Sequence, residues 1–379
     1  MTGVRSVREK PLINPFEYKT ISVGADFVDR IEEKKTLRNC MVSGQNVTLY
    51  SPRKYGKSSL IHECFRLIGK DCITAYIDMN VINGIGEFAS ALVESVSRAA
   101  YGKAEFFMRD IGNVLSGLRP VIRPEPDGFS VSVKIDEIER DLPDALSLPQ
   151  KVAERRRKRV VVAIDEFQRI GEFGGGEIER LMRSEIQMQK NVSYVFSGSS
   201  VHMLREMFES GDRPFFQSTK MMELELMPPE YFKPYILSRF EEMGFPIAPE
   251  IADEILALCG GHPQRTKELC FDLWNRAALG RPVPDVGGVK SALLELAKAD
   301  GYVENAWNSL KAPQRRLLIA LATEKDAQIY SSEIIRKYDL KSPSHIQRTI
   351  GSLEEKGILY KGKFADPFMM NWAAEAHPD

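Results

Sequence analysis

One short segment constrains the fold of this 379-residue chain more than any other. Gly56, Lys57 and Ser58 stand between an apolar run at residues 47–50 and a second apolar run at residues 59–64. A strand, a tight loop with Gly-Lys-Ser and a helix, in this order, are typical of a phosphate-binding loop. Backbone N–H groups and the helix N-terminus hold the anion, the lysine reaches the β- and γ-phosphates, and the serine hydroxyl binds Mg²⁺.

The loop departs from the usual pattern at one position. The pattern has glycine first, and this chain has Ser51 there. A Gly-Lys-Ser tripeptide is common by chance, whereas a strand pattern before it and a helix pattern after it are not, so we predict that the loop binds phosphate. The predicted nucleotide contacts in the loop are Ser51, Pro52, Arg53, Lys54, Tyr55, Gly56, Lys57, Ser58 and Ser59.

The composition is that of an ordinary globular protein, with 43% hydrophobic and 28% charged residues. The net charge of −1 provides no global attraction for polyanions, so a nucleic-acid site would have to be a local patch. The five cysteines are scattered in apolar contexts, which predicts buried reduced thiols. We find neither a secretory signal pattern nor an apolar stretch of membrane-spanning length, and therefore expect a cytoplasmic protein with no membrane contact.

Short apolar runs alternate with helical patterns in the first part of the chain. This alternation predicts an α/β fold with a parallel five-stranded sheet covered by helices. An inserted β-hairpin is predicted at residues 119–135, with its turn at residues 126–128, and a Gly-rich loop at residues 172–176. The predicted strands are residues 47–50, 72–79, 160–164, 192–196 and 221–226, and the predicted helices are residues 27–40, 58–68, 86–100, 137–158 and 177–189.

From Pro228 onward the pattern is helical, interrupted at residues 260–263 by Gly-Gly-His-Pro. We read four regions: an N-terminal arm (1–20), an ATPase-like core (21–227), a helical lid (228–300) and a winged-helix domain (301–379). The expected lid helices are residues 229–243, 250–258, 263–279 and 286–299.

Two carboxylates, Asp165 and Glu166, follow the apolar strand at residues 160–164. Ligands of open α/β sheets bind at the carboxyl ends of the strands. There Asp165 would hold Mg²⁺ together with Ser58, and Glu166 would act as general base for the attacking water. The alternative interpretation is a helix-capping acidic pair in a surface loop.

The next strand ends in Ser197 and Ser199, either of which could position water or the γ-phosphate; a simple helix N-cap is the alternative. Arg213 lies between the fourth and fifth strands, where an arginine of a neighbouring protomer stabilises transition-state charge in ring-forming ATPases. Arg205 is a second candidate for this role, and an ordinary salt-bridged arginine is the alternative for both.

Further short segments accompany the loop and the acidic strand end. Together they resemble the archaeal-type ATPase family of the AAA+/STAND superfamily over nearly the whole chain. In that family serine is tolerated at the first loop position. The segments are residues 14–16 (Asn-Pro-Phe), 27–30 (Phe-Val-Asp-Arg), 51–60, 164–167 (Ile-Asp-Glu-Phe), 198–199 (Gly-Ser), 260–263 and 366–368 (Asp-Pro-Phe).

The resemblance implies further nucleotide contacts. Phe27 and Arg30 would contact the adenine side of the nucleotide, and the Gly-His-Pro element ending at Pro263 would close the lid over the base. Arg265, just beyond this element, is a candidate lid arginine for the γ-phosphate, and a solvated helix residue is the alternative.

The last region reads as three helices followed by a short hairpin. Ser331 and Ser342 are predicted N-caps, and Pro343 follows at the first helical position. In DNA-binding winged helices the third helix enters the major groove. Residues 342–363 would then contact duplex DNA, or alternatively a protein partner. The exposed candidates are Ser344, His345, Gln347, Arg348, Lys361 and Lys363.

The densest basic run, residues 155–159, is predicted as a solvated helix end or as a phosphate-backbone contact. From these features we expect an ATP-binding and slowly ATP-hydrolysing molecular switch, with ATP and Mg²⁺ as cofactors. Its output would be homo-oligomer assembly or DNA or protein binding through the winged helix. A replication-initiator-like DNA-binding ATPase and a regulatory scaffold that does not hydrolyse nucleotide are the alternatives.

Overall fold

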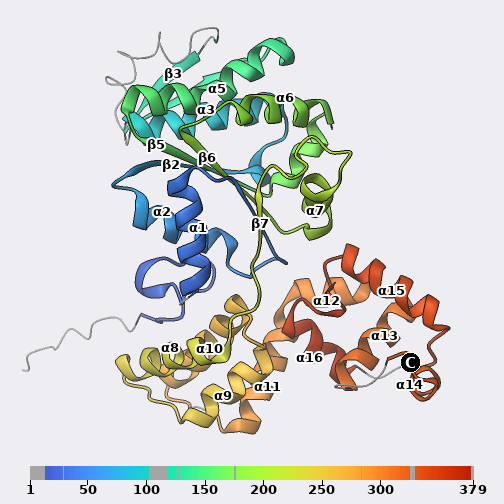
Figure 1. Cartoon of the computed structure of the whole chain (residues 1–379). Helices are drawn as coiled ribbons and strands as arrows, with labels where there is room; N and C mark the ends of the chain where they lie inside the picture. Colours follow the sequence, from blue (N-terminus) through green and yellow to red (C-terminus); the bar gives the residue numbers. More distant parts are fainter. Residues whose placement is uncertain are drawn as a thin grey trace, which may run out of the picture. The chain divides into compact units, whose positions relative to one another are not determined.

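The structure, a computed structural model, describes residues 13–28, 30–101, 118, 120–126, 128–174, 176–282, 284–324 and 329–376. Two compact units are present (Figure 1). The core unit runs from Arg30 to Glu225, and the helical unit combines residues 13–28 with residues 226–376. Residues 1–12 of the predicted arm, residue 127 of the predicted hairpin turn and residue 175 of the Gly-rich loop lie outside the described residues.

Parallel strands form the centre of the core unit, in the order β2-β5-β6-β1-β7. All neighbouring pairs are parallel, so the five carboxyl ends meet at one edge of the sheet. β5 is buried from Val160 through Asp165, as expected for a strand with both faces covered. The strands are β1 (Val47–Tyr50), β2 (Cys72–Asp78), β5 (Arg159–Asp165), β6 (Val192–Gly198) and β7 (Lys220–Glu223).

Helices cover both faces of this sheet. In Figure 1, α1 and α2 lie on one face, and α3 and α5 lie on the other, with α6 beside α5. Each helix buries one apolar stripe: in α3, Phe88, Leu92 and Val96 lie four residues apart and are fully buried. The helices are α1 (Ile31–Ser43), α2 (Lys57–Ile68), α3 (Ile85–Tyr101), α5 (Ile138–Arg156), α6 (Gly176–Gln187) and α7 (Val201–Glu209).

The predicted hairpin is confirmed, since β3 (Pro120–Glu125) pairs antiparallel with β4 (Gly128–Val133). The predicted start of the first helix is wrong. Phe27 has extended backbone after a short 3-10 turn at Gly24–Asp26, and α1 begins only at Ile31. Its N-cap, Arg30, has a left-handed φ of 61°, which interrupts a right-handed helix. The apolar spacing from Phe27 therefore runs across a turn.

The helical unit contains the predicted lid helices and a winged helix. Both share one apolar core, in which Phe16 of the N-terminal segment is fully buried, with its ring centroid 4.8 Å from that of Phe240. Residues 21–28, assigned to the core by sequence, therefore group with the lid. The elements are α8 (Pro229–Glu242), α9 (Pro249–Cys259), α10 (Pro263–Ala278), α11 (Val286–Ala299), α12 (Gly301–Asn308), α13 (Ala312–Thr323), α14 (Ser332–Lys337), α15 (Pro343–Glu355), β8 (Leu359–Tyr360), β9 (Lys363–Phe364) and α16 (Pro367–Glu375).

All five cysteines are buried free thiols, as the sequence predicts. Within the part of the chain that the structure describes, no helix combines the length and the apolar character needed to cross a membrane.

Candidate nucleotide site

The loop that joins β1 to α2 has the backbone of an anion site. Lys54 and Gly56 have positive φ values of 67° and 94°, and this left-handed backbone turns the chain sharply into α2. Gly56 is the N-cap of α2 and has no side chain that could cap the first turn of this helix. The first-turn N–H groups can therefore bind an anion, which the positive end of the helix dipole also favours.

The Lys57 side chain is buried and faces the start of the loop. Its Nζ donates hydrogen bonds to the Ser51 carbonyl at 2.9 Å and the Pro52 carbonyl at 3.0 Å. Burial lowers the pKa of Lys57 to about 8, although the charges of Glu166 and Asp165 oppose this effect. The ammonium group thus sits in a dry oxygen-lined position beside the two carboxylates predicted from the sequence.

Ser51 replaces the usual first glycine without backbone strain. It is fully buried and is not among the residues with positive φ, so the position has no need of glycine's conformational freedom. Its hydroxyl lies 3.3 Å from Lys57 Nζ and donates to the Pro52 carbonyl at 3.1 Å. The serine therefore helps to hold the lysine in the loop.

Asp165, at the end of β5, accepts hydrogen bonds from three hydroxyl groups. Ser58 and Tyr76 donate to its Oδ2 at 2.6 Å and 2.5 Å, and Ser197 donates to its Oδ1 at 2.5 Å. Burial acts to raise the pKa of Asp165, but these hydrogen bonds outweigh it and lower the pKa below its usual value. Asp165 is therefore a carboxylate at neutral pH.

The Ser58 hydroxyl and the Asp165 carboxylate fit a magnesium ion as oxygen ligands. Mg²⁺ takes hard oxygen ligands, keeps several waters and usually binds one or two carboxylates together with substrate phosphates. A serine hydroxyl and an ionised carboxylate, 2.6 Å apart at the N-terminus of α2, are oxygen donors of this kind.

Glu166 follows directly and has a left-handed φ of 52°. Its Oε2 accepts hydrogen bonds from the backbone N–H and the hydroxyl of Ser199, at 3.2 Å and 2.9 Å. Ser197 at the end of β6 thus contacts Asp165, whereas Ser199, just after the strand, contacts Glu166. The Glu166 carboxylate is thus held at the carboxyl edge of the sheet, where the phosphate loop also lies, and can take up a proton from a water bound there.

Arg30 holds the phosphate loop through hydrogen bonds to backbone carbonyl groups. Its guanidinium is buried and donates to the carbonyl oxygens of Tyr55 and Glu225, each at 2.9 Å, and it pairs with Glu33 at 3.1 Å. Burial lowers the pKa of Arg30, and Glu33 opposes this. Arg30 therefore ties the phosphate loop to the chain after β7, whereas Phe27 belongs to the helical unit.

Both candidate trans-acting arginines are engaged within the chain. Arg213 pairs with the fully buried Glu179 at 2.5 Å and with Glu206 at 3.4 Å. Arg205 pairs with Glu209, one helical turn away in α7, at 2.8 Å. These contacts favour the salt-bridged alternative, and action on a neighbouring protomer stays a prediction for both.

Arg265 also has partners, all in the helical unit. Its side chain is 1% exposed and pairs with Asp366 and Asp300, each at 2.6 Å, and with Glu268 at 2.8 Å. It begins helix α10 together with Pro263. Nucleotide contact by Phe27, Pro263 and Arg265 stays a prediction.

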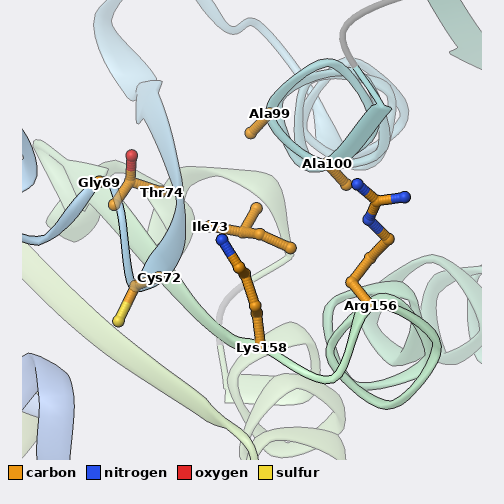
Figure 2. Close-up of a pocket in the computed structure, with 8 residues that line it drawn as sticks. All are labelled: Gly69, Cys72, Ile73, Thr74, Ala99, Ala100, Arg156 and Lys158. Atoms are coloured by element: carbon orange, nitrogen blue, oxygen red, sulfur yellow. The ribbon is translucent and has the colours of Figure 1, made fainter.

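The predicted basic run lies elsewhere in the core unit. Figure 2 shows an open pocket of about 270 Å³ where β2 and β5 begin. Arg156 and Lys158 line it, and Lys158 Nζ donates to the Lys70 carbonyl at 2.9 Å. Parallel strands begin at one edge of a sheet and end at the other, so this pocket is separate from the site around Asp165.

The winged helix has the predicted hairpin, and both predicted serines stand at N-cap positions, although the Ser342 side chain makes no capping hydrogen bond. The Ser331 hydroxyl accepts the Ile334 N–H at 3.3 Å, and α15 begins with Pro343 after Ser342. Glu354 accepts the N–H of Gly362 in the wing at 2.8 Å, so its carboxylate holds the wing against α15. Exposed side chains on α15 and the wing are Ser344, Gln347, Arg348, Lys361 and Lys363, while His345 is half-buried.

Sequence reasoning missed two residues of the site, Tyr76 and Gln168. Tyr76 reaches Asp165 because β2 neighbours β5, and Gln168 donates to Glu166 from the turn after β5. A polar residue near the end of an apolar strand was the available signal for Tyr76. For Gln168 it was a glutamine two residues beyond the acidic pair.

The sheet order, the loop and the acidic strand end define the fold class: the core unit has the fold of P-loop NTPases of the AAA+ type, and the helical unit contains a winged helix. Residues 301–375 match a family model described as a probable winged helix domain. A comparison with curated proteins gives no match.

Solved structures share this architecture over nearly the whole chain. The Walker-type ATPase of Pyrococcus abyssi is 16% identical, with a TM-score of 0.66 over 95% of this chain and 99% of that chain. The ORC2 protein of Aeropyrum pernix, solved as ADPNP–ADP complexes, is 14% identical (TM-score 0.56, 96% of both chains). The ORC1 protein of the same organism, solved with DNA, is 15% identical (TM-score 0.52, 95% and 94%). These likenesses confirm the predicted fold.

Proposed function

We propose that this chain binds ATP with Mg²⁺ at the carboxyl edge of β1, β5 and β6 and hydrolyses it as an AAA+/STAND-type switch. One observation carries the proposal. Lys57 and the consecutive pair Asp165 and Glu166 come from distant parts of the sequence and meet at one edge of the sheet, with Ser58 2.6 Å from Asp165. This combination of a phosphate-binding lysine, a metal-binding carboxylate and a base is what phosphoryl transfer to water requires.

Each residue has a defined role in the reaction. Lys57 gives up its hydrogen bonds to the loop carbonyls and donates instead to the β- and γ-phosphates. The first-turn N–H groups of α2 bind phosphate oxygens. Ser58 and Asp165 hold Mg²⁺, which when bound neutralises charge on those oxygens. Glu166 takes a proton from water as the water oxygen bonds to the γ-phosphorus. The bond from that phosphorus to the β,γ-bridging oxygen breaks, and ADP and phosphate leave.

The output of the switch is homo-oligomer assembly or binding of a partner through the winged helix. The match of residues 301–375 to a probable winged helix domain supports such a module. A replication-initiator-like DNA-binding ATPase is the second candidate function. It is favoured by the shared fold with the ORC1 protein solved with DNA and by the exposed Arg348 on α15.

The test is nucleotide binding and turnover in matched variants. Lys57→Ala should weaken ATP binding by about 100-fold or more, because it removes charged hydrogen bonds worth ~3 kcal/mol. Glu166→Gln should keep the wild-type dissociation constant and lose turnover by about 100-fold or more. Lys190→Ala, an exposed lysine before β6, should change neither quantity and serves as the control. Tight ATP binding by the Lys57 variant would refute the site.

A further inference from the structure

Gln168 makes the shortest hydrogen bond to Glu166. It lies in the 3-10 helix η3 (Phe167–Phe173) and is 7% exposed. Its Nε2 donates to Glu166 Oε2 at 2.6 Å, whereas the two donors of Ser199 lie at 2.9 Å and 3.2 Å from the same oxygen. All three donors therefore hold the Glu166 carboxylate through the same oxygen.

The three donors contact only one of the two carboxylate oxygens of Glu166. All of them reach Oε2, and no donor from the described residues reaches Oε1. Gln168 holds Oε2 from the turn after β5, and Ser199 holds it from the end of β6. This arrangement fixes the carboxylate through one oxygen and keeps the other open to a water.

The carboxamide of Gln168 fills a space that exists because residue 198 is a glycine. A Cβ at Gly198 would lie 2.0 Å from Gln168 Oε1 and 3.0 Å from Leu204. Contacts this short require a neighbour to move, so the carboxamide occupies the space where a side chain of residue 198 would stand. The Oε1 atom of Gln168 is buried without a hydrogen-bond partner among the described residues. Close packing, rather than a second hydrogen bond, therefore holds the carbonyl side of this carboxamide.

We propose that Gln168 is a positioning residue for the general base. It holds the Glu166 carboxylate by Oε2 so that Oε1 can accept the proton of the attacking water, and Gly198 provides the space that Gln168 needs. The inference rests on the proposed ATP hydrolysis at this site, and Gln168 itself touches no reacting atom.

The first test separates turnover from binding. Gln168→Met keeps the volume of the side chain and removes its N–H donor, and Gln168→Ala removes both. Each should lower kcat by about 10- to 100-fold, as is usual for the partners that orient a reacting group, with the KM and the dissociation constant for ATP unchanged within about twofold. Gly198→Ala should produce the same loss with Gln168 still in place.

The matched control is a second glutamine of the core unit. Gln189 donates to the Leu146 carbonyl at 2.8 Å and accepts from the Tyr194 hydroxyl at 2.9 Å, away from Glu166. Gln189→Ala should therefore keep wild-type kcat. If Gln168→Ala unfolds, Gln168→Met decides, because it leaves no cavity.

A pH profile gives a readout that a purely structural role would not move. Gln168→Glu places a second carboxyl group within hydrogen-bond distance of Glu166, and two such groups share one proton. The acidic limb of the pH–rate profile should then move to higher pH by about one unit or more. An unshifted limb contradicts direct action on the base.

The outcomes separate this inference from the proposed function. If the wild type turns over ATP and Gln168→Met retains full kcat, the positioning role is wrong. A loss of ATP affinity in Gln168→Met as large as its loss of kcat also overturns the positioning role, because such a loss would mean that the phosphate loop has been disturbed. If the wild type shows no turnover above the Lys57→Ala background, the proposed hydrolysis fails, and the role of Gln168 fails with it.

Discussion

At the scale of single residues, the burial of Lys57 makes nucleotide binding depend on pH. Burial lowers the pKa of this lysine to about 8. As the pH rises above that value, the free protein increasingly holds a neutral amine, which must take up a proton before it can pair with phosphate. We predict that the dissociation constant for ATP rises above about pH 8, by up to about tenfold per pH unit. Titration calorimetry between about pH 7 and pH 9.5 measures it.

Lys57→Arg provides the control, because a guanidinium stays charged over this range. Its own, weaker affinity for ATP should show no rise of this kind. A wild-type dissociation constant that stays flat to about pH 9.5 would contradict the low pKa of Lys57.

The residues of the site differ in how far the sequence could predict them. Lys57, Ser58, Asp165 and Glu166 could be assigned because each stands at a fixed offset from an apolar run. Tyr76 could not, since its contact with Asp165 depends on which strands are neighbours in the sheet. Arg265 has an ordinary helical position in the sequence, and only the fold brings Asp366 to it from about a hundred residues away.

At the scale of elements, helix α15 carries the prediction about nucleic acid. Arg348 is exposed on it, and Glu354 is bound to the wing N–H of Gly362, so the wing is held beside the helix. If the winged helix binds duplex DNA, Arg348→Ala should weaken binding and lower the slope of log affinity against log salt by about one. Fluorescence anisotropy over a range of salt concentrations measures both.

Lys298→Ala is the control for this experiment, since Lys298 is an exposed cation on lid helix α11. It should leave both the affinity and the salt slope unchanged. Equal effects of the two substitutions would indicate non-specific attraction, and no binding by the wild type would favour a protein partner for α15.

Element boundaries were predictable where turn residues mark them. Pro343 after Ser342 begins α15 as expected. The start of α1 was not predictable, because Arg30 adopts a left-handed φ that arginine seldom has and that only the surrounding contacts stabilise. The apolar spacing alone therefore placed this helix too early.

At the scale of the whole molecule, one buried arginine joins the lid to the winged helix. Arg265 of α10 pairs with Asp366, the N-cap of α16, and with Asp300, the N-cap of α12. Burial acts to lower the pKa of Arg265, but the hydrogen bonds and charge of Asp366 outweigh it and raise the pKa. The guanidinium also lies 4.2 Å from the centroid of the Phe368 ring, a cation–π contact with the first turn of α16. A movement of the lid would therefore carry the winged helix with it.

This linkage predicts the effect of Arg265→Ala. Removing the buried cation leaves three partly buried carboxylates without their partner, which should destabilise the helical unit by about 3 kcal/mol. The chain provides a selective probe, because its three tryptophans, Trp274, Trp307 and Trp372, all lie in this unit. Tryptophan emission during urea unfolding should therefore show a lower midpoint.

Arg276→Ala, on the same helix, is the matched control. Arg276 is partly exposed and pairs with Asp272 at 2.6 Å and Glu295 at 2.7 Å, so its loss should cost below about 1 kcal/mol. ATP affinity measured in parallel decides between the two roles of Arg265. An unchanged unfolding midpoint together with weaker ATP binding would make Arg265 a nucleotide contact. A lowered midpoint with unchanged ATP affinity would make it the structural link through which lid and winged helix move as one body.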